Sequence, residues 1–161
     1  MTPVAESVRL HPDCAPLSGL IGTWTGEGEG FYPTIDRFGY REETTFSHVG
    51  KPFLAYVQRS WRLDDETPAH SESGFWRPRP DGAIEVVLAH SFGGVEVLEG
   101  SRVGESIDLT SVAFVPTASA KDIRRVHRIY RSSSSLLEYE IAMEAVGQPL
   151  QGHLTARLTK S

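Results

Sequence analysis

The histidines are the side chains of this sequence with the widest chemical use, because an imidazole both transfers protons near neutral pH and binds metals. Six are present, at positions 11, 48, 70, 90, 127 and 153. They match neither HxxxH nor HExxH spacing, and a single cysteine provides no sequence support for a structural zinc site. The nucleophile elbow, the P-loop and the dinucleotide fingerprint are also absent from the sequence. Any chemistry is therefore expected to come from a bound cofactor.

His153 has the most informative surroundings, in the segment GQPLQGHL at 147–154. Pro149 and Gly152 predict a turn immediately before the last strand. This turn would place His153 at the start of that strand, with its imidazole held in place by the surrounding backbone. This position suits a single axial ligand to haem iron, which needs a neutral imidazole nitrogen and an open pocket. On spacing alone, the alternative is a surface histidine at the start of a strand.

Four other side chains are candidates for the wall of a binding pocket. His70 and His90 fall in segments of alternating polarity, so either could point inward toward a ligand; as structural histidines they need only a hydrogen-bond partner. Met143 has the periodicity of a core residue first and of a pocket wall second. Lys121 precedes a predicted strand and could pair with a carboxylate, with a solvated loop lysine as the alternative.

The segment GTWTGEG places Gly22, Trp24, Gly26 and Gly28 at two-residue spacing. Alternate side chains of a strand share a face, so one face would carry a bulky indole among three glycines. Glycine inside a strand usually marks a bend or a close approach of another backbone or a ligand. We expect a sheet that curls early around Trp24, with a plain glycine-rich edge strand as the alternative.

The rest of the chain is expected to be almost entirely β-structure, because two-residue alternation recurs between short turn signals. The predicted strands are 22–31, 39–48, 53–63, 69–77, 83–90, 94–102, 106–114, 123–131, 136–146 and 151–160. A short helical turn is expected from Pro12 through Leu17, ending near Gly19 or Gly22 and plugging one end, after a loose segment at 1–11. Short connections favour an up-and-down antiparallel barrel forming one domain over 1–161, similar in architecture to lipocalins and fatty-acid-binding proteins.

Composition limits the partners and the compartment. The net charge is −5 and the arginines are scattered, which argues against nucleic acid and anionic membranes as partners. Cys14 is the one cysteine, and the chain has neither a secretory signal pattern nor an apolar run of about 20 residues. We expect a cytoplasmic protein with a small-molecule ligand.

Four segments of this sequence, in this order, resemble the nitrobindins, a family of small haem-binding β-barrels. They are GTWTGEGEGFYPTI at 22–35, FSHVGKPFLAYVQRSW at 46–61, HSESGFWRPRPDG at 70–82 and QPLQGHL at 148–154. The resemblance extends from Gly22 to about Lys160, and GxWxGxG is the hallmark of the family.

The resemblance implies a ten-stranded barrel that holds one b-type haem near one mouth, with His153 as the proximal ligand. It further implies that Thr34 and Lys121 contact the haem, the lysine at a propionate, and that His70, His90 and Met143 border the cavity. Nitrobindins keep the iron ferric, bind nitric oxide and isomerise peroxynitrite to nitrate, so the same activity is expected here.

A second hypothesis comes from a different class of function. In this alternative the barrel carries a fatty acid or another apolar small molecule, as lipocalin-like proteins do, without haem catalysis. Homodimerisation is a further expectation, with Trp61, Phe75 and Trp76 as candidate outward-facing side chains.

Overall fold

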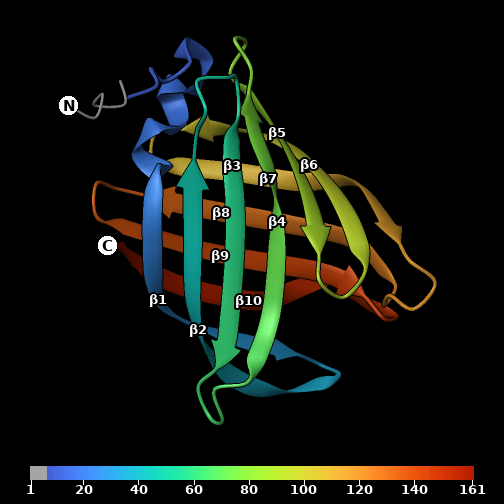
Figure 1. Ribbon diagram of the computed structural model, residues 1–161. Coiled ribbons are helices and arrows are strands. Elements are labelled where there is room, and N and C mark those ends of the chain that lie inside the picture. Colours follow the sequence, from blue (N-terminus) through green and yellow to red (C-terminus); the bar gives the residue numbers. More distant parts are fainter. Residues whose placement is uncertain (1–6) are drawn as a thin grey trace.

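A computed structural model of the protein describes residues 7–161 and forms a closed ten-stranded β-barrel with one 3₁₀ helix (Figure 1). The elements are η1 (Pro12–Leu20), β1 (Gly22–Tyr32), β2 (Ile35–Ser47), β3 (Leu54–Arg62), β4 (Pro68–Pro78), β5 (Ala83–His90), β6 (Gly94–Val103), β7 (Ser106–Pro116), β8 (Ile123–Ser132), β9 (Leu136–Ala145) and β10 (Gln148–Lys160). Consecutive strands pair antiparallel, and β1 pairs with β10 to close the barrel. The predicted ten-stranded antiparallel barrel is confirmed, and residues 1–6 of the expected loose segment lie outside the described residues.

The strands follow the predicted inside–outside alternation. On β5 the side chains of Ile84, Val86 and Leu88 are buried, and β9 likewise buries every second residue from Leu137 to Ala145. Two strand starts were predicted too late: β2 begins at residue 35 instead of 39, and β10 at 148 instead of 151. In both strands, the residues before the predicted start pair with the neighbouring strand across a register shift. Such a shift interrupts the two-residue alternation on which the sequence prediction relied.

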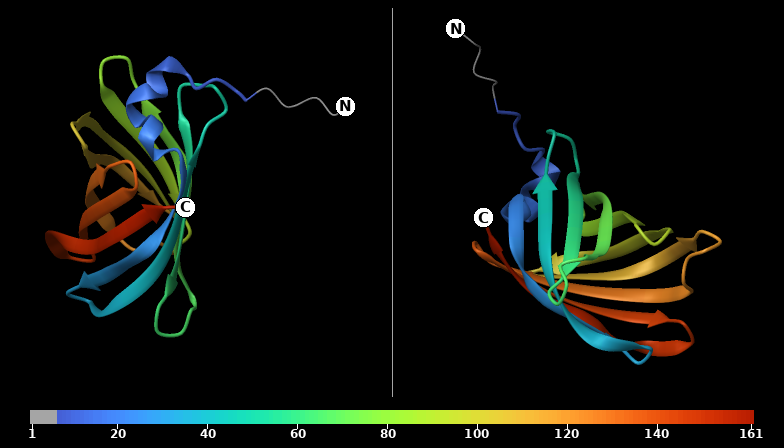
Figure 2. Two further views of the ribbon diagram at one scale, coloured as in Figure 1. Left: turned by 90° about the vertical axis from the view of Figure 1, so that its left-hand side faces the viewer. Right: turned by 60° about the horizontal axis from the view of Figure 1, so that its bottom comes forward.

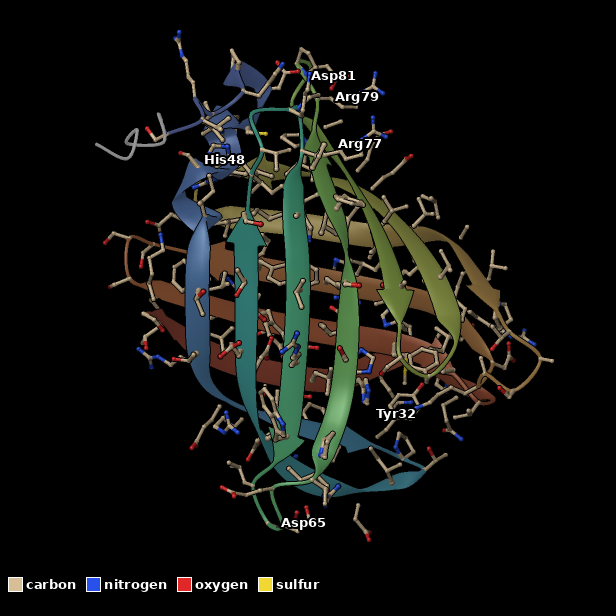
Figure 3. All side chains as sticks on the ribbon, viewed as in Figure 1. Tyr32, His48, Asp65, Arg77, Arg79 and Asp81 are labelled. Carbon is tan, nitrogen blue, oxygen red and sulfur yellow. The ribbon has the colours of Figure 1, made fainter. Side chains whose placement is uncertain are left out.

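The two ends of the barrel differ. The β2–β3 and β4–β5 hairpins lie at the same end as η1 (blue), whereas the β1–β2 and β3–β4 hairpins project from the other end (Figures 1 and 2). In Figure 3, His48 and Asp81 mark the helix end, and Asp65 marks the opposite tip. Since hairpins alternate between ends in an up-and-down barrel, the β5–β6, β7–β8 and β9–β10 connections also lie opposite η1.

The helix closes its end of the barrel, as predicted. Its side chains Cys14, Leu17 and Leu20 are buried in the core. Trp24 Nε1 donates a 2.8 Å hydrogen bond to the carbonyl of Leu20, and Lys160 Nζ donates one of 3.1 Å to the carbonyl of Gly19. A ligand must therefore enter from the opposite end. No helix within residues 7–161 has the length and hydropathy needed to cross a membrane.

The glycines of GxWxGxG allow close approaches inside the barrel. Trp24 is fully buried, so the shared face points inward. A Cβ added at Gly26 would lie 2.1 Å from the carbonyl oxygen of Arg157 on β10, and one at Gly28 would lie 2.5 Å from the ring of Tyr40. A neighbouring backbone and a core side chain, not a ligand, therefore require the absence of side chains at these two positions.

The three large side chains expected on the outer surface differ in exposure. Phe75 is exposed, but Trp76 is buried in an edge-to-face contact with Phe46, so its prediction was wrong. Adjacent strand residues face opposite sides, and Trp76 takes the inward position because Phe75 takes the outward one. Trp61 is half-buried, and the guanidinium of Arg41 lies 4.3 Å from the centre of its ring.

Candidate functional site

The barrel encloses a cavity of about 230 Å³ that reaches toward the end opposite η1. Side chains near this mouth include Phe38, Phe92, Phe114, Lys121 and His153. Deeper lining side chains include Glu42, Tyr56, Glu72, Glu96, Arg128, Tyr130 and Tyr139. Pockets that enclose a drug-sized ligand usually measure roughly 300–1,000 Å³. A large planar ligand would therefore remain partly exposed at this mouth.

His153 reaches the cavity because β10 is bulged at this point. Gly152 and Leu154 pair with Ala142 and Ile141, which are adjacent on β9, so His153 is an extra residue on its strand. A bulge leaves one residue out of the ladder and redirects its side chain. The local geometry around His153 is thus set by the pairing of two strands.

The turn that the sequence predicted just before His153 lies elsewhere, which corrects that prediction. The β9–β10 turn is formed by Val146 and Gly147, which have φ values of 47° and 78°. Two residues of positive φ make the tightest hairpin turns. Pro149 lies inside β10, within a second register shift between Gln148 and Gln151, where a missing backbone N–H interrupts no regular ladder.

The imidazole of His153 is held in one orientation and one tautomer. Its Nδ1 lies 3.0 Å from the carbonyl oxygen of Phe31, which only accepts hydrogen bonds, so Nδ1 carries the proton and Nε2 keeps its lone pair. The ring of Tyr32 packs edge-on against it, with 5.4 Å between ring centres. Burial lowers the pKa of His153, against the opposing effect of its hydrogen bond to the Phe31 carbonyl, and the nearby charge of Lys121 lowers it further. A neutral imidazole with a free Nε2 is the form that binds metals.

Other predicted site residues are distributed unequally around the cavity. Met143 is buried and lines the wall, which is the dual role that its periodicity indicated. Lys121 lies in the β7–β8 connection at the mouth, with Nζ 5.4 Å from the centre of the Phe92 ring. Thr34 lies in the exposed β1–β2 turn and lines a separate surface depression together with Ile35. The structure thus brings Met143, Lys121 and His153 to one cavity and leaves Thr34 beside it.

His70 and His90 both line the cavity and contact each other. His90 Nδ1 lies 3.3 Å from His70 Nε2 and 3.2 Å from Glu72 Oε2. His70 Nε2 lies 3.3 Å from the same Glu72 oxygen. On its other side, His90 Nε2 lies 3.3 Å from Glu96 Oε1. Both histidines therefore have the hydrogen-bond partners that a structural role requires, and both also face the ligand space.

A buried ion cluster lies beneath the two histidines. Arg128 Nη1 donates to Glu72 Oε1 at 2.7 Å, and its Nη2 donates to Glu96 Oε1 at 2.8 Å. Tyr56 donates a further 2.7 Å hydrogen bond to Glu72. The guanidinium of Arg128 holds the pKa of Glu72 well below its usual range, against the opposing effect of burial. The floor of the cavity is therefore charged and rigidly paired.

Comparison with known proteins agrees with this geometry. The family model of the THAP4-like, haem-binding β-barrel domain matches residues 13–160. This chain belongs to that family. The match covers the whole barrel and confirms the resemblance to the nitrobindins.

Relatives of this nitrobindin barrel cover nearly its full length. Peroxynitrite isomerase 2 of Mycobacterium avium (strain 104) is 48% identical over 155 residues, which cover 92% of this chain and 95% of the relative. Peroxynitrite isomerase of Nocardia farcinica (strain IFM 10152) is 45% identical over 168 residues, covering 99% of both chains. The crystal structure of Rv2717c from M. tuberculosis superimposes with a TM-score of 0.89 at 41% identity, covering 95% of this chain and 99% of that one.

A third buried acid, Glu42, lies at the floor of this nitrobindin barrel. Glu42 accepts hydrogen bonds from Thr44 at 2.7 Å and from Tyr139, whose hydroxyl also contacts that of Tyr40 at 2.6 Å. No cation pairs with Glu42 within residues 7–161, and burial raises its pKa to about 7. The glycine at position 28 makes this network possible, because its missing Cβ leaves room for the Tyr40 hydroxyl.

Glu42 therefore makes the stability of this barrel depend on pH. Its pKa rises from an ordinary 4.5 to about 7 on folding, so the stability that it contributes is complete below pH 4.5 and is lost as pH rises through 7. Between pH 5 and 8 the loss is about 2–3 kcal/mol. Glu42→Gln, which cannot ionise, should lack this component. Urea unfolding of both proteins at pH 5 and pH 8 measures it, and parallel losses in the two proteins would contradict the assignment.

The sequence analysis missed these charged groups of the cavity floor, although a signal was present. Each charged residue stands two positions from an inward-facing neighbour on its own strand, as Arg128 does from Tyr130. The four residues are Glu42, Glu72, Glu96 and Arg128. A charge in phase with a core face predicts a buried ion. The register of the strands and the closure of the barrel, which sequence alone does not provide, bring these residues of β2, β4, β6 and β8 to one cavity.

Proposed function

We propose that this nitrobindin barrel binds one b-type haem at its open mouth, with the iron held by His153, and that it isomerises peroxynitrite to nitrate in the ferric state. The observation that carries the proposal is the neutral, oriented imidazole of His153, whose Nε2 lone pair is free in a cavity with an open end. Membership of a haem-binding family and relatives named peroxynitrite isomerase support the same conclusion.

The residues at the mouth fit a haem in size and charge. Phe38, Phe92 and Phe114 present aromatic surface to the cavity, and Met143 adds a polarizable wall. Lys121 is exposed at the rim, where a haem propionate would meet an ammonium group without the cost of burying a charge. Thr34, on the turn beside the mouth, is proposed to contact the exposed edge of the macrocycle. His70 and His90 border the cavity from β4 and β5.

In the proposed reaction, the residues of the chain position the haem and set its exposure to solvent. A bound ferric haem would supply a Lewis-acidic iron for the isomerisation of peroxynitrite to nitrate, which needs no electron donor. His153 would hold the iron through Nε2 from β10, and the open mouth of the cavity would admit peroxynitrite or nitric oxide. The small cavity would leave part of the haem in contact with water, a setting that would favour the ferric state. The Phe31 carbonyl keeps the imidazole in the ligating tautomer throughout.

The carrier hypothesis has less support from the same cavity. A fatty-acid carboxylate buried in a barrel needs a cation that is free to pair with it. Arg128 is the buried cation among residues 7–161, and its Nη1 and Nη2 are already paired with Glu72 and Glu96, which leaves only Nε without a partner in this part of the chain. The two glutamates would also repel a second carboxylate from this region.

Hemin titration of the apo-protein, followed by stopped-flow mixing with peroxynitrite, tests the proposed function. We expect a saturable Soret band at one hemin per chain, and accelerated peroxynitrite decay with nitrate as the product. Free hemin at equal concentration is the control for protein-independent decay. A colourless protein that co-purifies with a lipid, or haem-loaded protein without acceleration, would overturn the proposal.

We also propose that the protein is cytoplasmic and forms a homodimer through the outer face of β3 to β7. Val57, Phe75, Val95 and Val115 are exposed on this face, and Val95 and Val115 are direct cross-strand neighbours. Large exposed apolar side chains on one outer face favour association between protein copies. Light scattering after gel filtration tests the assembly, and a monomer mass at high protein concentration would contradict it.

A further inference from the structure

A second set of metal-binding atoms lies in this barrel, on strands other than the one that carries His153. His70 and Glu72 are on β4, and His90 ends β5. His70 Nε2, His90 Nδ1 and Glu72 Oε2 form a triangle with sides of 3.3, 3.2 and 3.3 Å. All three atoms can offer a lone pair, so the triangle has the composition of a two-histidine, one-carboxylate metal site.

We propose that His70, Glu72 and His90 bind a divalent transition-metal ion of the Zn²⁺ type. Nitrogen and oxygen ligands lie about 2.0–2.2 Å from zinc in tetrahedral geometry, which separates neighbouring ligand atoms by about 3.3 Å. The observed sides of the triangle match that separation. The triangle lines the cavity, so the fourth coordination position is open to water or a small ligand.

Glu96 supplies the outer support that a ligating histidine needs. A metal-bound imidazole usually donates its other N–H to a carboxylate, which fixes the tautomer. His90 Nε2 faces Glu96 Oε1 at 3.3 Å, so the proton belongs on Nε2 and the Nδ1 lone pair is directed into the triangle. Glu96 itself is held by Arg128 at 2.8 Å. Its Oε2 is buried without a hydrogen-bond partner in residues 7–161, which indicates an acceptor still available to the site.

The charge of the cavity floor also favours a cation at this place. Glu72 and Glu96 present two carboxylates to the single guanidinium of Arg128. A divalent cation at the triangle would balance the remaining negative charge. Two histidine nitrogens and one carboxylate oxygen select Zn²⁺ or Co²⁺ over Mg²⁺, which prefers oxygen ligands.

The test is calorimetric and spectroscopic titration of the apo-protein with Zn²⁺ and Co²⁺, with Mg²⁺ as the control ion. We expect one Zn²⁺ per chain, visible ligand-field bands of tetrahedral Co²⁺, and no heat with Mg²⁺. His70→Ala and His90→Ala should each weaken Zn²⁺ binding by more than the roughly 10–100-fold that loss of a supporting partner costs. The His70 side chain lines the cavity and is 30% exposed, so its truncation leaves the packed core intact.

Two control variants separate this site from other histidines. His127 lies on the outer surface 2.7 Å from Asp108, so His127→Ala removes a comparable histidine–carboxylate pair and should leave Zn²⁺ binding unchanged. His153→Ala should lose the haem Soret band and keep the Zn²⁺ site. A Zn²⁺ isotherm that survives in His153→Ala distinguishes failure of the haem proposal from failure of the metal proposal. Absence of a saturable Zn²⁺ isotherm, or equal loss in His127→Ala, would overturn the metal site.

Discussion

His153→Ala is expected to abolish the Soret band of the hemin-titrated protein and to weaken hemin binding by at least about 100-fold. Loss of a hydrogen-bond partner behind a metal ligand already costs roughly 10–100-fold in affinity, and loss of the ligand itself should cost more. The only bond from the chain to iron in the proposed site is the one from Nε2. Absorbance titration with hemin at several protein concentrations measures the change.

Two controls make the result for His153 specific. His48→Ala alters a histidine at the end of the barrel that carries η1 and should bind hemin normally (Figure 3). Added imidazole should restore a Soret band in His153→Ala, because the space left by the side chain admits a free ligand. Unchanged circular dichroism would show that the barrel is intact. Retention of a tight hemin complex with an unaltered spectrum would exclude His153 as the ligand.

Arg128→Met is expected to destabilise the barrel by about 3–5 kcal/mol at pH 7. Removal of one partner from a buried ion cluster leaves the others charged and unpaired, and this costs far more than the cluster contributes when intact. Here Glu72 and Glu96 would both lose their guanidinium in the core. Urea unfolding followed by tryptophan fluorescence measures the change in the free energy of unfolding.

A surface arginine on the same strand is the matched control for Arg128. Arg125 is exposed and lies 3.7 Å from Glu144, so Arg125→Met should cost less than about 1 kcal/mol. A triple variant, Arg128→Met with Glu72→Gln and Glu96→Gln, should recover much of the lost stability because it removes the unpaired charges. Equal effects of the two single arginine variants would contradict the ion-cluster interpretation.

The glycine motif and the cavity floor are physically connected. Gly28 leaves room for the ring of Tyr40, whose hydroxyl contacts Tyr139, and Tyr139 donates to Glu42. The family's hallmark segment thus serves the interior of the barrel and not the ligand directly. This explains how a motif remote from His153 in sequence can belong to the same functional unit.

The amino-acid sequence by itself determined the ten strands, the plugging helix and the inward face of GxWxGxG. These features follow from two-residue periodicity, turn residues and glycine spacing, all of which act between near neighbours in the chain. The family resemblance also selected His153. Lys121, His70, His90 and Met143 then proved to line the same cavity as His153.

The tertiary structure alone decided how His153 is presented and what lies beneath it. The bulge at His153 depends on the register between β9 and β10, and the hydrogen bond from its Nδ1 depends on the placement of Phe31 on β1. The ion cluster joins Glu72, Glu96 and Arg128 from three strands. Register and barrel closure bring together residues that are far apart in the chain, and local patterns carry no information on those distances.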